Sequence, residues 1–164
     1  MFKKTDRIGE DSCNTFGTLM RIVEYKDTHN IVVEFQDKYK TKVHTEYANF
    51  KKGNVKNPYD KTIYGVGYLG EGKYKSRVNK KLTRAYETWK HMLQRCYDPY
   101  YINKYPTYID VFVCELWHNF QNFAKWYEEN VYNCNGEEMH LDKDILIKGN
   151  KIYSPETCFL YHIG

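Results

Sequence analysis

A glycine- and lysine-rich stretch near the middle of the chain constrains the fold more than any other feature. Between residues 51 and 82, five glycines fall at positions 53, 65, 67, 70 and 72, and nine Lys or Arg residues stand against only Asp60 and Glu71. Sequence of this kind interrupts regular structure. The 164 residues are enough for one ordinary domain or two small ones. We predict a small β domain at 1–56, a basic Gly/Lys-rich connector at 57–82 and a second domain at 83–164.

The N-terminal part has the pattern of short β-strands. Runs at 18–25, 31–35 and 39–45 alternate apolar and polar residues and are separated by polar turns. This period of two is typical of strands with one buried face. We expect a small, curved, SH3-like antiparallel sheet.

The C-terminal part has a helical period instead. Thr83 is a plausible N-cap, and a second apolar stripe follows Cys114. The two stripes consist of Tyr86, Trp89, Met92, Leu93 and Cys96, and of Leu116, Trp117, Phe120, Phe123, Ala124 and Tyr127. A strand is expected at 108–114, and a polar loop at 133–136. Residues 141–147, 148–151, 152–153 and 154–158 then predict strand, turn, strand and helix start, a ββα outline. The fold class expected is α+β.

Charge and hydropathy exclude some classes of protein. The formal net charge is +4, which argues against an acidic DNA mimic and fits a surface that contacts phosphates. The candidate nucleic-acid contacts are Lys51, Lys52, Lys56, Lys73, Lys75, Arg77, Lys80 and Lys81. No apolar run is long enough for a membrane span or, at the N-terminus, for a secretory leader. We expect a cytosolic protein with reduced thiols.

Two further sequence patterns give little evidence for a function. The five cysteines include no C-x-x-C pair, so a disulfide framework is not expected. The segment 65–70 fits G-x-G-x-x-G, but no helix pattern follows it, as a dinucleotide site would require. We interpret these glycines as a conformationally permissive loop.

A longer constellation is more specific. It runs Tyr86-x-x-Trp89-x-x-Met92-x-x-Arg95-Cys96, then Val113-Cys114-x-x-Trp117-x-x-Phe120, then Leu141-Asp142-Lys143-Asp144, and ends Gly149-Asn150-Lys151-x-Tyr153-Ser154-Pro155-Glu156-Thr157-Cys158. In order and spacing it resembles HNH-endonuclease-like proteins of bacteriophages and mobile elements, over about half of the chain. The resemblance implies an HNH-like ββα module braced by two helices, acting in the cytoplasm of a bacterial host.

In HNH enzymes the ββα module holds one divalent cation, Mg²⁺ or Mn²⁺, against the scissile phosphate while a histidine activates water. The positions that this implies as catalytic are Asp142, Lys143, Asp144 and Asn150, with Glu156 nearby. Lys143 stands where the pattern has His or Arg, and an ordinary lysine is protonated at pH 7. His140 lies three residues earlier, so it points to the opposite strand face. The resemblance thus implies DNA binding with nuclease activity lost or impaired. A working endonuclease or nickase remains the alternative.

Three cysteines allow a structural zinc site. Cys96, Cys114 and Cys158 occupy positions that carry cysteine in the resembled pattern, with His140, His118 or Cys134 as a fourth ligand. The alternative is that they pack as small apolar side chains.

A tyrosine-rich segment supports a second functional hypothesis. Tyr97, Tyr100, Tyr101, Tyr105 and Tyr108 cluster beside Lys104 in an expected loop, where they would stack on bases or anchor a protein partner. Combined with the missing base, this favours a phage-encoded inhibitor that binds a host defence nuclease, an anti-CRISPR-like protein built on a nuclease-like fold.

Overall fold

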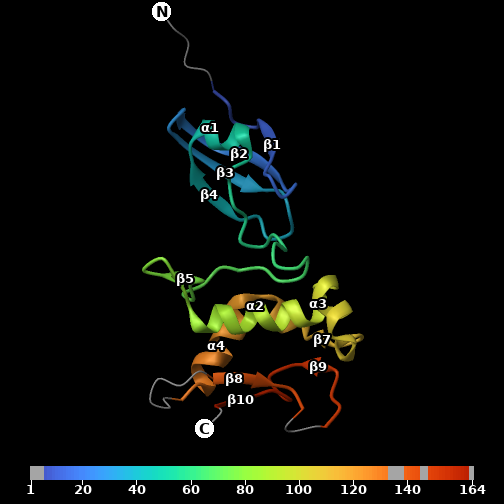
Figure 1. Ribbon diagram of the computed structural model, residues 1–164. Coiled ribbons are helices and arrows are strands. Elements are labelled where there is room, and N and C mark those ends of the chain that lie inside the picture. Colours follow the sequence, from blue (N-terminus) through green and yellow to red (C-terminus); the bar gives the residue numbers. More distant parts are fainter. Residues whose placement is uncertain (1–5, 133–138, 145–147, 163–164) are drawn as a thin grey trace, which may run out of the picture. The chain divides into compact units, whose positions relative to one another are not determined.

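A computed structural model describes residues 6–132, 139–144 and 148–162. The chain divides into two compact units, Met1–Asp60 and Lys61–Gly164. Both combine strands with helix, so the expected α+β class is confirmed. Figure 1 colours the first unit blue to green and the second green to red.

The first unit is a four-stranded antiparallel sheet in the order β1–β2–β3–β4, followed by one short helix. Its elements are β1 (Asp11–Cys13), β2 (Leu19–Asp27), β3 (Asn30–Phe35), β4 (Lys42–Thr45) and α1 (Tyr47–Lys52). The alternation places Met20, Ile22, Val33 and Phe35 in a core that Phe50 of α1 completes. The three expected strands are present. The sequence missed β1 because its three residues are mostly polar.

Buried polar contacts set the end of this unit at Asp60 rather than at residue 56. The Asn14 side-chain amide donates to the Val55 carbonyl (3.1 Å) and to the Asp60 carboxylate (2.8 Å), and the Thr18 hydroxyl donates to Asp60 as well. The predicted connector at 57–82 is therefore divided: 57–60 belong to the first unit, and 61–82 to the second.

The second unit is built on two amphipathic helices and short strand pairs. Its elements are β5 (Arg77–Val78), β6 (Lys81–Leu82), α2 (Arg84–Tyr97), α3 (Pro99–Lys104), the 3₁₀ turns η1 (Pro106–Tyr108) and η2 (Glu115–His118), β7 (Phe112–Val113), α4 (Phe120–Asn130), β8 (Met139–Asp142), β9 (Ile152–Tyr153) and β10 (Phe159–His162). Thr83 caps α2 as expected, its hydroxyl accepting from the Tyr86 N–H. The second predicted helix is divided at Asn119, whose side chain caps α4.

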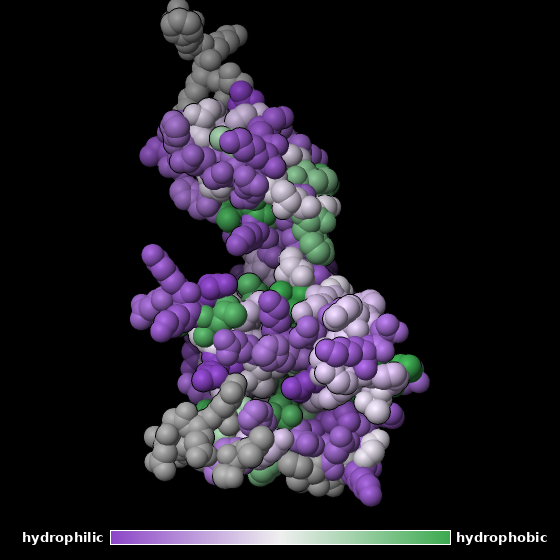
Figure 2. Space-filling view, viewed as in Figure 1, coloured by the Kyte–Doolittle hydropathy of each residue, from purple (hydrophilic) through white to green (hydrophobic). Residues whose placement is uncertain are grey.

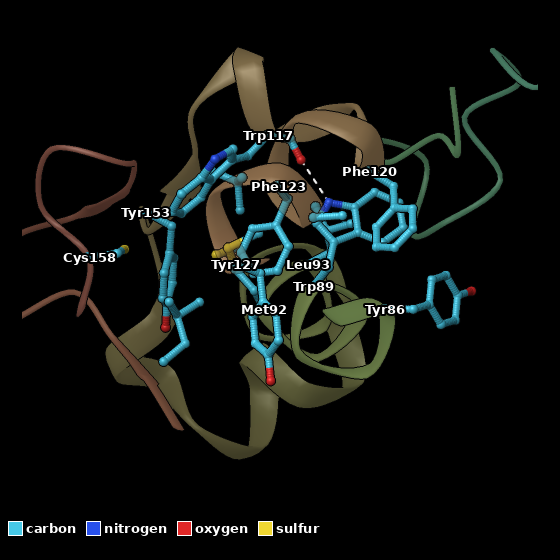
Figure 3. Packing of buried hydrophobic residues seen from close by; sticks show 14 of the residues in the cluster. Tyr86, Trp89, Met92, Leu93, Trp117, Phe120, Phe123, Tyr127, Tyr153 and Cys158 are labelled. Atoms are coloured by element: carbon cyan, nitrogen blue, oxygen red, sulfur yellow. Dashed lines mark hydrogen bonds between the residues drawn. The ribbon is translucent and has the colours of Figure 1, made fainter. Parts of the chain in front are cut away.

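The apolar stripes of α2 and α4 meet in an aromatic core (Figure 3). Trp89, Trp117 and Phe123 are fully buried. The indole N–H of Trp89 donates to the Trp117 carbonyl at 2.7 Å, which ties α2 to η2. These residues were expected to be core, and they are.

The glycine segment is a loop laid across this core. A Cβ on Gly67 would approach Leu93 Cδ1 to 2.4 Å and Trp89 Cζ2 to 2.9 Å, so only glycine fits there. Gly70 has a φ of +66° and lies against Asn119. The Gln121 side chain donates to the Leu69 and Tyr74 carbonyls and holds the loop on α4. The interpretation as a permissive loop is confirmed.

The C-terminal strands pair differently from the predicted ββα outline. β8 pairs antiparallel with β10, and β9 pairs in parallel with β7. Residues 154–157 form a turn, so the predicted helix start is wrong: Ser154 and Thr157 bond to each other, and Thr157 donates to the Ile152 carbonyl. The end of the predicted strand, at 145–147, and the predicted polar loop with Cys134 lie outside the described residues.

The tyrosine-rich segment is not a loop either. Asp98 caps the helix α3 by accepting from the Tyr100 N–H, and Pro99 starts it. Proline at the first helical position is pre-organised for a helix. The sequence predicted a loop here because Pro99 and Pro106 bracket the segment.

Candidate functional site

A cleft of about 530 Å³ lies in the second unit, between the end of α2, η1 and the segments around β8 and β9. It is lined by Arg95, Thr107, Tyr108, Leu141, Asp142, Lys143, Asp144, Lys148, Gly149, Asn150, Lys151, Tyr153 and Tyr161. All four residues predicted as catalytic from the sequence are among them. Among the described residues that line the cleft, four are cations and two are carboxylates.

Arg95 is the most unusual of these cations. It is half-buried in the last turn of α2, where no carboxylate in the described residues lies within ion-pair distance. Its neighbours are phenols: burial raises the pKa of Tyr153 well above its ordinary value, although the Arg95 guanidinium acts in the opposite direction. A guanidinium stays charged at any physiological pH. Arg95 therefore presents hydrogen-bond donors and a positive charge to the cleft.

Lys143 and the two aspartates form one local arrangement. The Lys143 Nζ donates to both carboxylate oxygens of Asp144 at 2.9 Å, with its side chain only 11% exposed. The Asp144 backbone N–H donates to Asp142 Oδ1. The ion pair with Asp144 fixes the position of the Lys143 side chain at the cleft.

Asn150 lines the cleft but has a positioning role. Its amide nitrogen donates to the carbonyls of Lys143 and Ile152, and its oxygen accepts from the Ile152 N–H. These bonds close the loop that carries Lys148 and Lys151, both exposed. Glu156 is also exposed and does not line the cleft.

The candidate zinc ligands lie in the core. Cys96 and Cys158 are buried and Cys114 is half-buried. Burial raises the pKa of Cys96 and of Cys158 to about 12; the neighbouring thiol of Cys158 also raises the pKa of Cys96, and that of Cys114 raises the pKa of Cys158. High thiol pKa values favour neutral, packed side chains.

Two of the possible fourth ligands, His140 and His118, have other partners, and the third, Cys134, lies outside the described residues. The His140 ring lies 5.8 Å from the Tyr161 ring, and His118 Nε2 lies 2.9 Å from the Val113 carbonyl oxygen. In the part of the chain that the structure describes, no three His, Cys, Asp or Glu residues are grouped to hold a metal ion. Zinc binding stays a prediction.

The eight basic residues predicted to contact DNA are exposed, and none lines the cleft. Lys51, Lys52 and Lys56 belong to the first unit, where Lys51 lies 3.7 Å from Glu10. Lys73, Lys75, Arg77, Lys80 and Lys81 belong to the second.

Sequence reasoning missed three cations of the cleft, Arg95, Lys148 and Lys151. Arg95 was in view, but only as part of the scaffold motif. Lys148 and Lys151 flank the turn at Gly149, where a basic turn looked like ordinary solvated surface. No local signal marks these three as neighbours, because the cleft joins the end of α2 to segments some 50 residues later in the chain.

The tyrosines of the predicted contact loop have separate environments. Tyr108 lines the cleft. The Tyr97 hydroxyl accepts from the Val113 N–H (2.9 Å), and the Tyr101 ring packs on those of Tyr105 and Tyr108. Tyr100 is 76% exposed.

Among the described residues, the helices are too short or too polar to cross a bilayer. Comparisons of the chain with protein-family models, with curated proteins and with solved structures found no match.

Proposed function

We propose that this protein binds DNA through the cationic cleft of its second unit, and that nuclease activity is lost or impaired. The observation that carries the proposal is Arg95, a half-buried guanidinium without a carboxylate partner in the described chain, at a cleft that also holds Lys143, Lys148 and Lys151. Arginine recognises phosphate through paired donors, and lysine adds charge.

Stacking groups support the same ligand. Tyr108, Tyr153 and Tyr161 line the cleft beside the cations. Aromatic rings next to basic side chains are what nucleic-acid-binding grooves offer to bases and phosphates together. We include in this proposal the HNH-like identity of the second unit, because Asp142, Lys143 and Asp144 lie at the same cleft. The SH3-like identity of the first unit is part of the proposal as well.

The loss of cleavage rests on Lys143. Its ammonium is held by Asp144, so it is a poor general base, and Asp144 is correspondingly less available to Mg²⁺ or Mn²⁺. We expect supercoiled plasmid to stay intact with either metal. Nicking that is abolished by Asp142→Ala would overturn this part of the proposal and establish a nickase.

Binding is tested by fluorescence anisotropy with a labelled 20-base-pair duplex. Hydrogen bonds to charged groups contribute about 1.5–3 kcal/mol, so Arg95→Ala should weaken binding roughly 10- to 100-fold. Removing Lys148 and Lys151 together should lower the slope of log K against log salt by about 2. The matched control is Lys125→Ala, an exposed cation of α4 that does not line the cleft.

Two results would refute the cleft as the binding site. One is an absence of duplex binding at low salt by the unaltered protein. The other is an equal loss for Arg95→Ala and Lys125→Ala, which would mean that only overall charge matters.

A specific observation favours the second candidate, a protein-binding inhibitor of a host defence nuclease. Several apolar side chains between α3 and η2 are about half or more exposed: Tyr100, Ile109, Phe112 and Leu116. Such side chains are common in protein contacts. A host nuclease retained after nucleic-acid digestion, and released by Tyr100→Ala with Leu116→Asp while DNA affinity is unchanged, would support this candidate over the first.

A further inference from the structure

The β5–β6 hairpin is a tight and unusual turn. Its two strands are joined by Asn79 and Lys80 alone, with φ of 51° and 66°. Positive φ at both central residues is the type I′ geometry, which asparagine and glycine tolerate and which other side chains disfavour. Lysine therefore stands at the turn position where glycine would fit more easily.

The pairing register shows which face of the hairpin is free. Arg77 pairs with Leu82, and Val78 pairs with Lys81. Leu82 packs against the core of the second unit, so the face with Val78 and Lys81 points away from it. Val78 is 55% exposed, in agreement with this orientation.

The hairpin carries a concentrated positive charge. Lys75, Arg77, Lys80 and Lys81 are all exposed, and across the described ranges no carboxylate lies within ion-pair distance of any of them. The Arg77 guanidinium donates to the Lys80 carbonyl at 3.2 Å, which braces the turn. Figure 2, viewed as Figure 1, shows hydrophilic side chains projecting where the hairpin lies.

One residue joins the hairpin to α2. The Thr83 N–H donates to the Ser76 carbonyl (2.9 Å) and its hydroxyl donates to the Lys75 carbonyl (3.0 Å), while the same oxygen caps α2. The base of the hairpin and the first turn of α2 therefore share one anchor. The cations are presented on a fixed support rather than on a loose loop.

The length of α2 sets the distance between hairpin and cleft. Arg95 lies twelve residues after Thr83. At 1.5 Å per residue, the two are about 18 Å apart along the helix. Half a turn of duplex DNA rises about 17 Å. In Figure 1 the hairpin lies at one end of α2, and α3 and β7 lie at the other.

We propose that the β5–β6 hairpin is a second contact for duplex DNA, holding the backbone about half a helical turn from the segment bound in the cleft. The inference rests on the proposed function of the cleft and adds the form of the ligand. A two-stranded ribbon fits the width of the major groove, and its cations neutralise phosphates at the groove edge. A duplex holds its backbone at both places with a fixed spacing, whereas a single strand has to be ordered before it contacts both.

The positive φ of Lys80 makes it possible to remove a charge from the hairpin without disturbing its fold. Lys80→Gly removes one charge and relieves the positive φ, so the hairpin keeps its fold; Lys81→Gln is added to remove a second charge. The matched control is Asn79→Gly in the same turn, which changes no charge. Melting temperatures of all variants should stay close to that of the unaltered protein.

The probes are a 20-base-pair duplex and a 5′-phosphorylated thymidine dinucleotide, which is too short to span about 18 Å. We expect Lys80→Gly with Lys81→Gln to weaken duplex binding roughly 10-fold and to lower the salt slope by about 2, with dinucleotide binding unchanged. Arg95→Ala should weaken binding of both probes, and Asn79→Gly of neither.

Each alternative outcome has a separate meaning. If the hairpin variant matches Asn79→Gly on the duplex while Arg95→Ala is weakened, the second contact is refuted and the cleft stands. If the hairpin variant loses the dinucleotide as well, the two contacts are one site and the spacing is refuted. If Arg95→Ala changes neither probe, the cleft itself fails.

Discussion

Trp89→Phe tests whether the aromatic core positions the cleft. The substitution removes the indole N–H that donates to the Trp117 carbonyl at 2.7 Å, at a side chain with no exposed surface. A buried carbonyl that loses its donor costs about 1–3 kcal/mol. The smaller ring leaves a void of at least methyl size, which adds about 1 kcal/mol. We expect the second unit to lose about 2–4 kcal/mol of unfolding free energy.

The chain offers a selective assay for this change. All three tryptophans, Trp89, Trp117 and Trp126, lie in the second unit. Intrinsic tryptophan fluorescence during urea unfolding of the whole protein therefore reports on that unit alone. The midpoint should fall while the dependence of the free energy on urea stays the same.

Trp126→Phe is the matched control. Trp126 is half-buried, and its indole N–H makes no hydrogen bond within the described residues. Its replacement should cost about 1 kcal/mol or less. If the two variants differ by less than about 0.5 kcal/mol, the bond between α2 and η2 does not contribute as argued.

Three other predictions follow from local features. Gly67→Ala should destabilise the second unit by about 1–3 kcal/mol in the same assay, because its Cβ would lie 2.4 Å from Leu93 Cδ1; a neutral result would contradict the close packing of the loop. Cys13 should react with a maleimide in the native protein, whereas Cys96 and Cys158, buried and with pKa values near 12, should react only on unfolding. A chelator that exposes them, together with zinc in elemental analysis, would instead establish zinc ligation. The Tyr47 hydroxyl donates to Glu10 at 2.6 Å and lowers the pKa of that carboxyl below its ordinary 4.5, so the first unit should lose stability as pH falls below about 4.5. Amide NMR intensities of the first unit should show a shallower loss in Glu10→Gln, and an identical profile would refute the coupling.

Periodicity predicted the parts of the fold whose signals are local. The stripes from Tyr86 to Cys96 and from Phe120 to Tyr127 repeat every three or four residues and became α2 and α4. Strands β2, β3 and β4 of the first unit alternate apolar and polar residues, so they were found as well, whereas β1 was missed. Thr83 was recognised as a cap because a hydroxyl directly before an apolar helical stripe can accept a hydrogen bond from a free N–H of the first turn.

The remaining errors have a common physical origin. β7 and β9 are two-residue strands that pair in parallel across 40 positions, Phe112 with Ile152, and nothing in either short segment encodes the partner. Ser154-Pro155 is as good a turn as a helix start. The cleft was half predicted for the same reason: Asp142, Lys143 and Asp144 are consecutive, whereas Arg95 meets them only in the folded chain.

The pairing of β7 with β9 and of β8 with β10 also determines the order in which the protein can fold. The strands of the first unit pair with neighbours close in sequence, so that unit can form once the chain as far as Asp60 has been synthesised. The second unit must wait for Tyr153, Cys158 and Leu160, which complete a core that Trp89 and Trp117 began much earlier. Until then its aromatic side chains lack their cover, and such non-local closure is slow. The cleft, whose walls come from both ends of this interval, is among the last features to form, and the nascent second unit is the part most exposed to aggregation.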